Sequence, residues 1–360
     1  MKKHLLFVLM IACYSVFGQG HQPVFSDKSG AELMDLLREN YKPVSALDYG
    51  IARDTLFAVV YGQNHTLTGV YTGYSITLPD GVDPTSFAYM NGGPNGMNTE
   101  HTYPRSKGAE NGNAKADMHH LYPTRIDVNE RRGHNPFGEI NDNDTEDWYY
   151  LGAHQSNPPT TNRDLYSEAT DNLFEPPEAH KGNVARAMFY FYTMYRNQAD
   201  SADPNFFESQ RETLCEWHLL DPVDADEWNR TFMIAQYQDG RPNPFVLDCT
   251  LAARTYCPDQ ECVIIATEDP SQDAYRLFES YPNPFHGTTT IHYELKQAYQ
   301  VSIMLTDALG RNVKTVVDTR QSEGEYKLEV NDLQPGVWFY HIILENEKGV
   351  QQLTGKMLAY

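Results

Sequence analysis

Basic residues are scarce in this chain. Its 360 residues contain 28 Lys and Arg against 49 Asp and Glu, which gives a net charge of −21 and a pI near 4.9. This balance excludes a protein that binds polyanions through its bulk charge, so any nucleic-acid chemistry needs a local site. Hydrophobic residues at 40% and aromatic residues at 12% are too many for a disordered chain. We therefore expect a folded protein, with a length that suits roughly two or three domains.

Long apolar runs are also missing. The run at residues 5–13 follows Lys2 and Lys3 and is far shorter than the roughly 20 residues that a membrane span needs. Basic, apolar and then small residues in this order are typical of a secretory signal peptide. We expect it to cover residues 1–18, with cleavage after Gly18. No later segment reaches the length of a span, so the sequence predicts a secreted protein.

Cysteine is rare as well. Of five cysteines, Cys13 lies in the expected signal peptide, which leaves four: Cys215, Cys249, Cys257 and Cys262. An even number in a secreted chain favours disulfides, and the four lack the paired CxxC spacing of a structural zinc site. Their pairing stays open among three connectivities.

The composition changes near residue 270. Residues 19–265 contain helical and loop-rich stretches, with helices predicted over 29–40 and 183–196 and a strand over 56–62. A linker is predicted at 266–276. Residues 277–360 then consist of short alternating runs between Gly, Pro, Asn and Asp turns, roughly seven strands in all, which predicts a small antiparallel β-sandwich of the Ig-like type. The whole chain is thus expected to be α+β.

Titratable residues concentrate between residues 98 and 135. Glu100 and His101 are adjacent. The eighteen residues from 117 to 134 then contain Asp117, His119, His120, Asn129, Arg131, Arg132 and His134. Few folds need so many such groups for stability, so the cluster indicates a site. Residues 100–132 carry six bases and five acids, a net charge of +1 in an otherwise anionic chain. We expect shallow, phosphate-directed and salt-sensitive binding there.

This set of residues suits phosphodiester hydrolysis. A neutral imidazole takes a proton from attacking water, and a hard divalent ion on a few oxygen ligands neutralises the phosphate and the leaving oxygen. The carboxylate of Glu100 and the carboxamide of Asn129 are suitable ligands. Arginine supplies forked donors for phosphate oxygens, and four lie close in sequence: Arg105, Arg125, Arg131 and Arg132.

The motif NTEHTYPRS, followed by D-x-H-x-L-x-P and V-N-x-x-R over residues 117–132, resembles the bacterial endonuclease I family. Its members are secreted or periplasmic nonspecific nucleases with a ββα-metal (His-Me finger) site, and further matches lie at residues 181–191, 217–230 and 238–248. The resemblance implies that His101 is the general base. It implies that Glu100 and Asn129 bind Mg²⁺, with Mn²⁺ or Ca²⁺ as alternatives.

Other positions of the motif are less defined. Arg132 matches a basic position of the family, and we count it with His101 and Arg105 as a catalytic candidate. The phosphate-binding arginine stays open between Arg105 and Arg125. His120 stands where the family often has Asn, while His119 holds the matched position.

The C-terminal segment resembles a type A sorting domain of the type IX secretion system. The resemblance is carried by YPNPF at 281–285, DALGRNV at 307–313, LQPGVWFYHI at 333–342 and the strand around Lys356. It implies export across both membranes, to the medium or the cell surface, with the secretion machinery as partner and no stable protein partner. An ordinary Ig-like accessory domain is the alternative.

Taken together, these features predict a secreted, Mg²⁺-dependent, sequence-nonspecific endonuclease. DNA is the expected substrate, RNA stays open, and the resemblance implies 5′-phosphate products. One alternative is a zinc hydrolase that uses His101, His119, His120 and His134. Another is a noncatalytic, calcium-stabilised surface or adhesion protein that uses the acidic loop at 138–150. Simpler roles also exist: Asp117 could hold His119 as a structural residue, and Arg131 and Arg132 could pair with the acidic loop.

Overall fold

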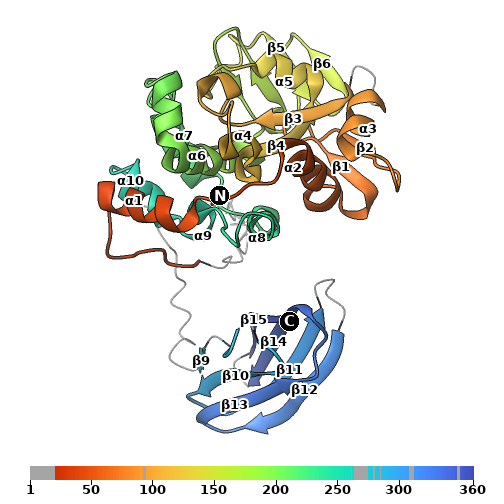
Figure 1. Cartoon of the computed structure of the whole chain (residues 1–360), viewed down its shortest axis with the longest axis vertical. Coiled ribbons are helices and arrows are strands. Elements are labelled where there is room, and N and C mark those ends of the chain that lie inside the picture. Colours follow the sequence, from red (N-terminus) through yellow and green to blue (C-terminus); the bar gives the residue numbers. More distant parts are fainter. Residues whose placement is uncertain are drawn as a thin grey trace, which may run out of the picture. The chain divides into compact units, whose positions relative to one another are not determined.

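The computed structural model describes residues 21–360 apart from 92–94, 261, 263–274, 279, 284, 308–311 and 347–348. The chain divides into two compact units, Met1–Ile264 and Ile265–Tyr360 (Figure 1). The expected signal peptide and most of the expected linker lie outside the described residues. The last two linker residues, Tyr275 and Arg276, belong to strand β9 (Tyr275–Leu277). Within the described ranges, no helix has both the length and the apolar character to cross a membrane.

The first unit mixes helices with short strands, which confirms the α+β class. Its helices are α1 (Gly30–Tyr41), α2 (Tyr49–Thr55), α3 (Pro84–Asn91), α4 (Asn113–Ala116), α5 (Ile126–Arg132), α6 (Lys181–Ala202), α7 (Arg211–Leu220), α8 (Ala225–Ala235), α9 (Pro244–Leu247) and α10 (Thr250–Thr255). Its strands are β1 (Thr66–Thr68), β2 (Ser75–Thr77), β3 (Met97–His101), β4 (Leu121–Arg125), β5 (Asp147–Tyr150), β6 (Ala153–Gln155), β7 (Ser167–Ala169) and β8 (Phe174–Glu175). They form three small sheets, in the orders β1-β2, β3-β4 and β6-β5-β7-β8.

Helix α6 lies at the centre of the first unit. Val184, Met188, Phe191 and Tyr195, which recur at helical spacing, are all buried, and so are most residues between them. A helix that is buried on every side needs neighbours on every side. Helices α1, α7 and α9 pack against α6, and Figure 1 shows α7 running beside it.

The prediction of a strand at residues 56–62 is wrong. This segment forms a π-helical turn, η1 (Leu56–Val60), that continues α2, and the Tyr61 N–H donates to the Leu56 carbonyl at 2.9 Å. Leu56, Phe57 and Val60 are buried, whereas Val59 is 43% exposed. Valine and phenylalanine favour strands locally, but this burial pattern is that of one face of a helix, and packing in a shared core with α8 outweighs the local preference.

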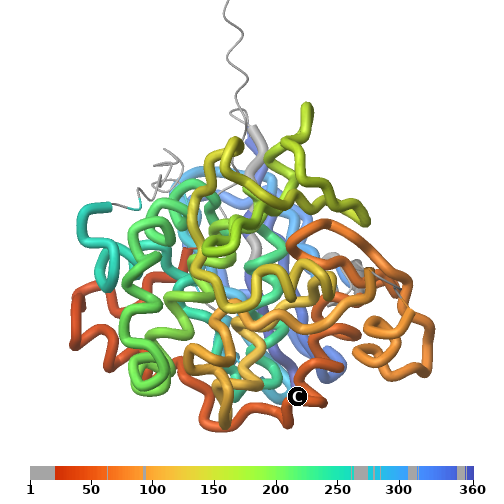
Figure 2. The backbone as a smooth tube through the Cα atoms, turned by 90° about the horizontal axis from the view of Figure 1, so that it is seen from above, coloured from red at the N-terminus to blue at the C-terminus, as the bar shows by residue number. Residues whose placement is uncertain are grey.

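The beginning of the first unit is attached to its end. The Val24 N–H donates to Asp248 Oδ2 at 2.8 Å. Arg254 donates to the same carboxylate and to the carbonyls of Val24, Phe25 and Lys28. As a result α1 lies beside α10, as Figures 1 and 2 both show.

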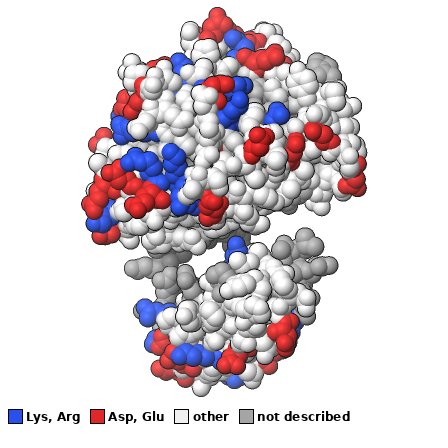
Figure 3. All heavy atoms as spheres, viewed as in Figure 1, with Lys and Arg blue, Asp and Glu red and all other residues white. Residues whose placement is uncertain are grey.

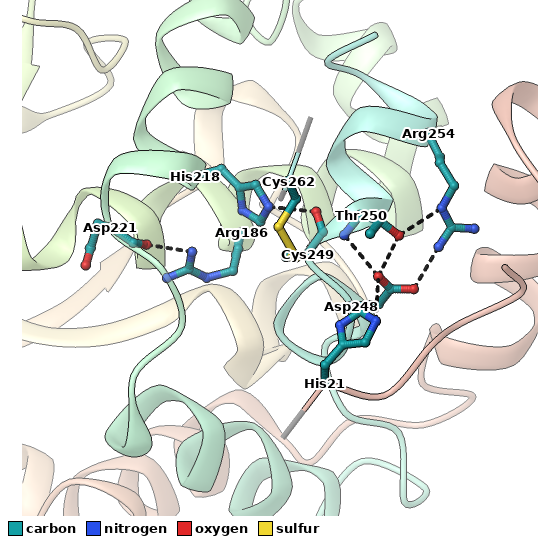
Figure 4. The surroundings of a disulfide bond; sticks show 9 residues. All are labelled: His21, Arg186, His218, Asp221, Asp248, Cys249, Thr250, Arg254 and Cys262. Carbon is teal, nitrogen blue, oxygen red and sulfur yellow. Dashed lines mark hydrogen bonds and ion pairs between the residues drawn. A yellow bond between two sulfur atoms is a disulfide. The ribbon is translucent and has the colours of Figure 1, made fainter. Parts of the chain in front are cut away.

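Two disulfides lie in this same region. Cys215 on α7 pairs with Cys257, and Cys249 pairs with Cys262. Figure 4 shows the second bond among the polar contacts of Asp248 and Arg254, with the His218 ring bonded to the Cys249 carbonyl. The prediction that these four cysteines form disulfides is confirmed.

The second unit consists of antiparallel strands. They are β9, β10 (Thr288–Leu295), β11 (Tyr299–Asp307), β12 (Asn312–Gln321), β13 (Gly324–Asn331), β14 (Gly336–Asn346) and β15 (Gly349–Ala359). One sheet has the order β13-β10-β9 and the other β12-β11-β14-β15. Side chains from both sheets form one hydrophobic core that is separate from the cores of the first unit.

Candidate functional site

Two antiparallel strands and one helix position the predicted site. Strands β3 and β4 are antiparallel, with Glu100 opposite Tyr122, and α5 begins at the residue after β4 ends. This places Asn129 of α5 beside the end of β3. A pocket of about 460 Å³ opens there, lined by Tyr49, Asn98, Thr99, Glu100, His101, Pro104, Arg105, Ser106, Glu110, Asn129, Gly133 and His134.

His101 has a defined tautomer. Its Nε2 lies 3.0 Å from the carbonyl oxygen of Lys115, and because a carbonyl can only accept, Nε2 carries the proton of the neutral ring. Nδ1 then has a free lone pair. Burial lowers the pKa of His101 well below the usual 6.5, and the neighbouring His120 lowers it further. The ring is therefore neutral at physiological pH, as a general base must be.

Glu100 is a buried carboxylate, only 2% exposed. Its Oε1 accepts a hydrogen bond from the Tyr71 hydroxyl at 2.9 Å and lies 3.1 Å from Nη1 of Arg132. Burial raises the pKa of Glu100, while Arg132 and Tyr71 oppose that rise. Both contacts are to Oε1, so Oε2 keeps acceptor capacity on the side chain that lines the pocket.

Asn129 is oriented by its amide nitrogen. Nδ2 donates to Asn98 Oδ1 at 2.7 Å and to the Thr99 carbonyl at 3.3 Å. This fixes the side chain so that its oxygen remains as the ligand atom. A carboxylate oxygen and a carboxamide oxygen in one pocket are hard donors, which fit Mg²⁺ with water completing its shell.

Two of the predicted histidines lie apart from the pocket. The rings of His119 and His120 bond to the carbonyls of Arg241 and Ala114, and burial lowers the pKa of each to about 4. His134 lines the pocket together with His101. In the described part of the chain, no group of three or more His, Cys, Asp or Glu side chains is arranged to hold a metal. The donor set for the zinc alternative is therefore not assembled among these residues.

Asp117 belongs to the interior. Its carboxylate accepts from the hydroxyls of Tyr190 and Tyr195, from the Gln238 amide and from the backbone N–H of His119. Asp117 thus holds the backbone of His119, whereas the His119 ring is held by the Arg241 carbonyl. The pair supports the turn between α4 and β4 and does not line the pocket.

Arg132 and Arg125 are both buried and are hydrogen-bonded to the protein. Arg132 donates to the carbonyls of His101 and Thr102 at 3.0 and 2.9 Å and contacts Glu100. These contacts hold the end of β3 in place. Arg125 donates to the carbonyls of Leu151 and Ala153 and forks onto Asp127. Neither lines the pocket. Arg132 is thus placed as a positioning residue.

The remaining arginines differ in exposure. Arg131 pairs with three acids, Glu146, Asp147 and Asp171, so the simpler role predicted for it, pairing with the acidic loop, is the one observed. Another acid of that loop, Asp142, pairs with Arg163. Arg105 lines the pocket with its side chain 47% exposed, which favours it over Arg125 for a phosphate contact.

Sequence reasoning missed three residues of the site. Tyr71 comes from the loop between β1 and β2, 29 residues before Glu100, and no motif marks it. Tyr49 lies at the start of α2 with its ring 5.6 Å from that of His101. Glu110 lines the pocket as the partner of Arg105. Only Glu110 had a signal, since an acid five residues from an arginine can pair with it.

Comparisons with known proteins agree with the families that the sequence motifs indicate. The family model for endonuclease I matches residues 38–250, and the model for a secretion system C-terminal sorting domain matches residues 279–356. With this sorting domain, the chain is exported to the medium or to the cell surface. The prediction of both families is confirmed.

Two curated relatives are both named extracellular ribonuclease. The one from Bacillus subtilis (strain 168) is 30% identical over 178 residues, which are 44% of this chain and 53% of the relative. The one from Bacillus amyloliquefaciens is 29% identical over 231 residues, 57% of this chain and 74% of the relative. This chain thus spans about half the length of the first relative.

Solved structures match more weakly. The PmoD soluble domain from Methylocystis has a TM-score of 0.19 at 14% identity and covers 22% of this chain and 76% of its own. PorZ, a surface component of the type-IX secretion system of Porphyromonas gingivalis, has a TM-score of 0.17 at 16% identity. The match covers 26% of this chain and 12% of PorZ. Scores this low are not informative about the fold. The family model, by contrast, covers more than half of the sequence together with its pocket residues, and the chain belongs to the endonuclease I family.

Proposed function

We propose that this protein is a secreted, metal-dependent endonuclease that hydrolyses phosphodiester bonds of DNA and RNA without sequence specificity. The observation that carries the proposal is the state of His101. Its Nε2–H is committed to the Lys115 carbonyl, which leaves Nδ1 as the basic nitrogen, and His101 lines one pocket with the oxygen donors Glu100 and Asn129. The names of the two Bacillus relatives support RNA as a substrate.

The proposed site has the parts of a ββα-metal centre. Glu100 and Asn129 would hold Mg²⁺, which supplies charge neutralisation at the scissile phosphate and the leaving oxygen. His101 Nδ1 accepts a proton from water, whose oxygen attacks phosphorus. The bond from phosphorus to the 3′ oxygen breaks and that oxygen takes up a proton from solvent, which leaves a 5′-phosphate and a 3′-hydroxyl. Arg105 donates to the phosphate, and Arg132 keeps the end of β3 in place.

The test is a cleavage assay with the purified full-length protein on plasmid DNA and on single-stranded RNA. We expect cleavage with Mg²⁺, loss of cleavage with chelator, and a loss of about 10²–10⁴-fold in His101→Ala, the usual contribution of a general base. Ca²⁺, Mn²⁺ and Zn²⁺ are compared in parallel.

The matched control is His154→Ala. His154 is an exposed histidine outside the pocket, bonded to Asp147, so its loss should leave cleavage unchanged. Full activity in His101→Ala would overturn the proposal. A requirement for tightly bound zinc would favour the zinc hydrolase instead, and no cleavage with any cation would favour the noncatalytic alternative.

For the second unit we propose a role in export alone. The match to the sorting domain and the separate hydrophobic core support handling by the type IX secretion machinery, apart from catalysis.

A further inference from the structure

One part of the pocket lining is an ion pair between two half-exposed side chains. Arg105 Nε donates to Glu110 Oε2 at 2.9 Å and Nη2 donates to Oε1 at 2.5 Å, so the guanidinium binds the carboxylate through two parallel hydrogen bonds. The side chains are 47% and 48% exposed. Lys115 Nζ approaches the same carboxylate at 4.0 Å and lies over the ring of Tyr49. The Glu110 carboxylate therefore lies between two cations at the pocket.

The basic side chains of residues 100–132 are all paired with acids of the chain itself. Each of the six bases in residues 100–132 has a carboxylate within ion-pair distance, and among the residues that line the pocket Arg105 is the one Lys or Arg. On the face that Figure 3 shows, many, though not all, Lys and Arg atoms lie next to Asp and Glu atoms. A substrate phosphate thus meets no unpaired cation of this window in the pocket.

We propose that Glu110 occupies the place of a substrate phosphate, and that a nucleic-acid strand must displace it from Arg105 in order to bind. The inference rests on the proposed function, because it assumes that a phosphodiester enters this pocket. It goes beyond that function by assigning Glu110 a role in substrate selection.

The geometry makes the two anions equivalent for Arg105. Arginine binds carboxylate and phosphate with the same planar fork of two N–H donors, and an internal phosphodiester carries the same single negative charge. The Arg105 fork holds the pKa of Glu110 below its usual value, so Glu110, like a phosphodiester, is an anion at neutral pH. Because both side chains are half-exposed, water screens their attraction. Replacing the carboxylate by a phosphate therefore costs little free energy.

This exchange selects for polymers. An isolated anion such as inorganic phosphate gains little when it replaces Glu110, because one anion is traded for another. A strand brings further phosphates and bases that contact the pocket elsewhere. Glu110 would thus keep the site free of small anions while long strands still bind.

The experiment compares Glu110→Gln with wild type, both in a His101→Ala background so that the probe is not cleaved. The probe is a fluorescein-labelled, single-stranded 12-mer, and fluorescence anisotropy gives Kd over a series of salt concentrations. We expect Glu110→Gln to bind about 3–10-fold tighter. Its log Kd against log salt should steepen by about 0.7, the value for one additional phosphate contact on a single strand.

A matched control separates this local effect from net charge. Glu208 is exposed, forms a similar pair with Arg211 and lies outside the pocket, so Glu208→Gln removes the same charge elsewhere. It should leave both Kd and the salt slope unchanged. The double variant Arg105→Gln, Glu110→Gln should lose the gain. In the catalytically intact chain, Glu110→Gln should be inhibited more strongly by inorganic phosphate.

Equal or weaker binding by Glu110→Gln would overturn the proposal, and so would an equal gain in Glu208→Gln or in the double variant. These outcomes are distinct from failure of the proposed function. Anisotropy does not need cleavage, so an inactive wild type with a tighter Glu110→Gln would refute the activity alone. Normal cleavage with unchanged binding would refute the role of Glu110 alone.

Discussion

His101 illustrates how burial prepares a single residue for catalysis. Its pKa lies well below 6.5, so the fraction of neutral base stays high in mildly acidic solution. We expect kcat/KM for plasmid cleavage to be maintained at pH 6 and to fall only in more acidic buffer, as the ring is protonated. A profile of kcat/KM against pH measures this. An acidic limb at pH 6.5 or above would show that burial does not control the base.

Arg132 is predicted to act through support of the site. It is 1% exposed and is the ion-pair partner of the buried Glu100. Arg132→Met leaves that carboxylate without a counter-charge, which should cost about 3–5 kcal/mol in the free energy of unfolding by urea. Arg132→Lys keeps the charge but not the fork onto the two carbonyls, so its loss should be smaller. If Arg132→Met came within 1 kcal/mol of wild type, this support would be unimportant.

Some of the site could be predicted residue by residue and some could not. Glu100, His101 and Asn129 share one pocket because the motif spacing matches a strand, a second strand and a helix. The sequence could not show which arginines are covered. The sequence does not distinguish Arg105 from Arg125, yet Arg105 lies on an exposed turn, while Arg125 donates to carbonyls of the β5–β6 loop and of the first residue of β6. Burial of this kind depends on distant elements.

At the scale of elements, a close approach positions the turn that carries Arg105. This turn, η4 (Arg105–Lys107), ends at Gly108, whose φ is +134° and whose missing Cβ would lie 2.8 Å from the Cα of Ala199 on α6. Gly108→Ala should push the turn away from α6. We expect a loss of about 1–3 kcal/mol in stability and a rise in KM, measured by urea unfolding and plasmid cleavage.

Gly112→Ala is the control for that contact. Gly112 also has a positive φ, +62°, but an added Cβ would meet nothing within 4 Å. It should show the backbone strain without the displacement of Arg105, and hence a lower stability with an unchanged KM. If the two variants raised KM equally, contact with α6 would not be the cause.

The predictions of secondary structure were correct where the hydrophobic pattern of the sequence was long. Helix α6 follows from an apolar spacing kept over four turns, and the alternating runs after residue 275 form strands. The strand prediction for residues 56–62 was wrong because this segment of seven residues, with its Val and Phe, has strand propensity. Its pattern of burial is equally compatible with a helical turn. The neighbouring helix α2 and the core decide between them.

At the scale of the whole molecule, catalysis and export should be separable. Among the residues that the structure describes, the hydrophobic cores of the first unit contain none beyond Cys257, and that of the second begins after residue 274. We expect a chain that ends at residue 264 to keep the plasmid cleavage rate of the full-length protein and its main calorimetric transition. A markedly lower melting temperature or lost cleavage would show that the second unit stabilises the first.

Net charge and cysteine pairing show the limits of sequence at this scale. The total of −21 predicts a local site, but only the structure shows that the six bases of residues 100–132 are already paired. The cysteines predicted disulfides, but not that Cys257 and Cys262, five residues apart, would take different partners. Pairing depends on where α7 brings Cys215, which no spacing reveals.

The attachment of Val24 to Asp248 and Arg254 has a consequence for the cell that makes this protein. These contacts join residues 224 and 230 positions apart, so the first unit cannot close until nearly all of it has been synthesised. Its disulfides, too, form only in an oxidising compartment. The proposed nuclease would thus complete its fold late and outside the cytosol, so that the genome and messenger RNA of its producer would be spared.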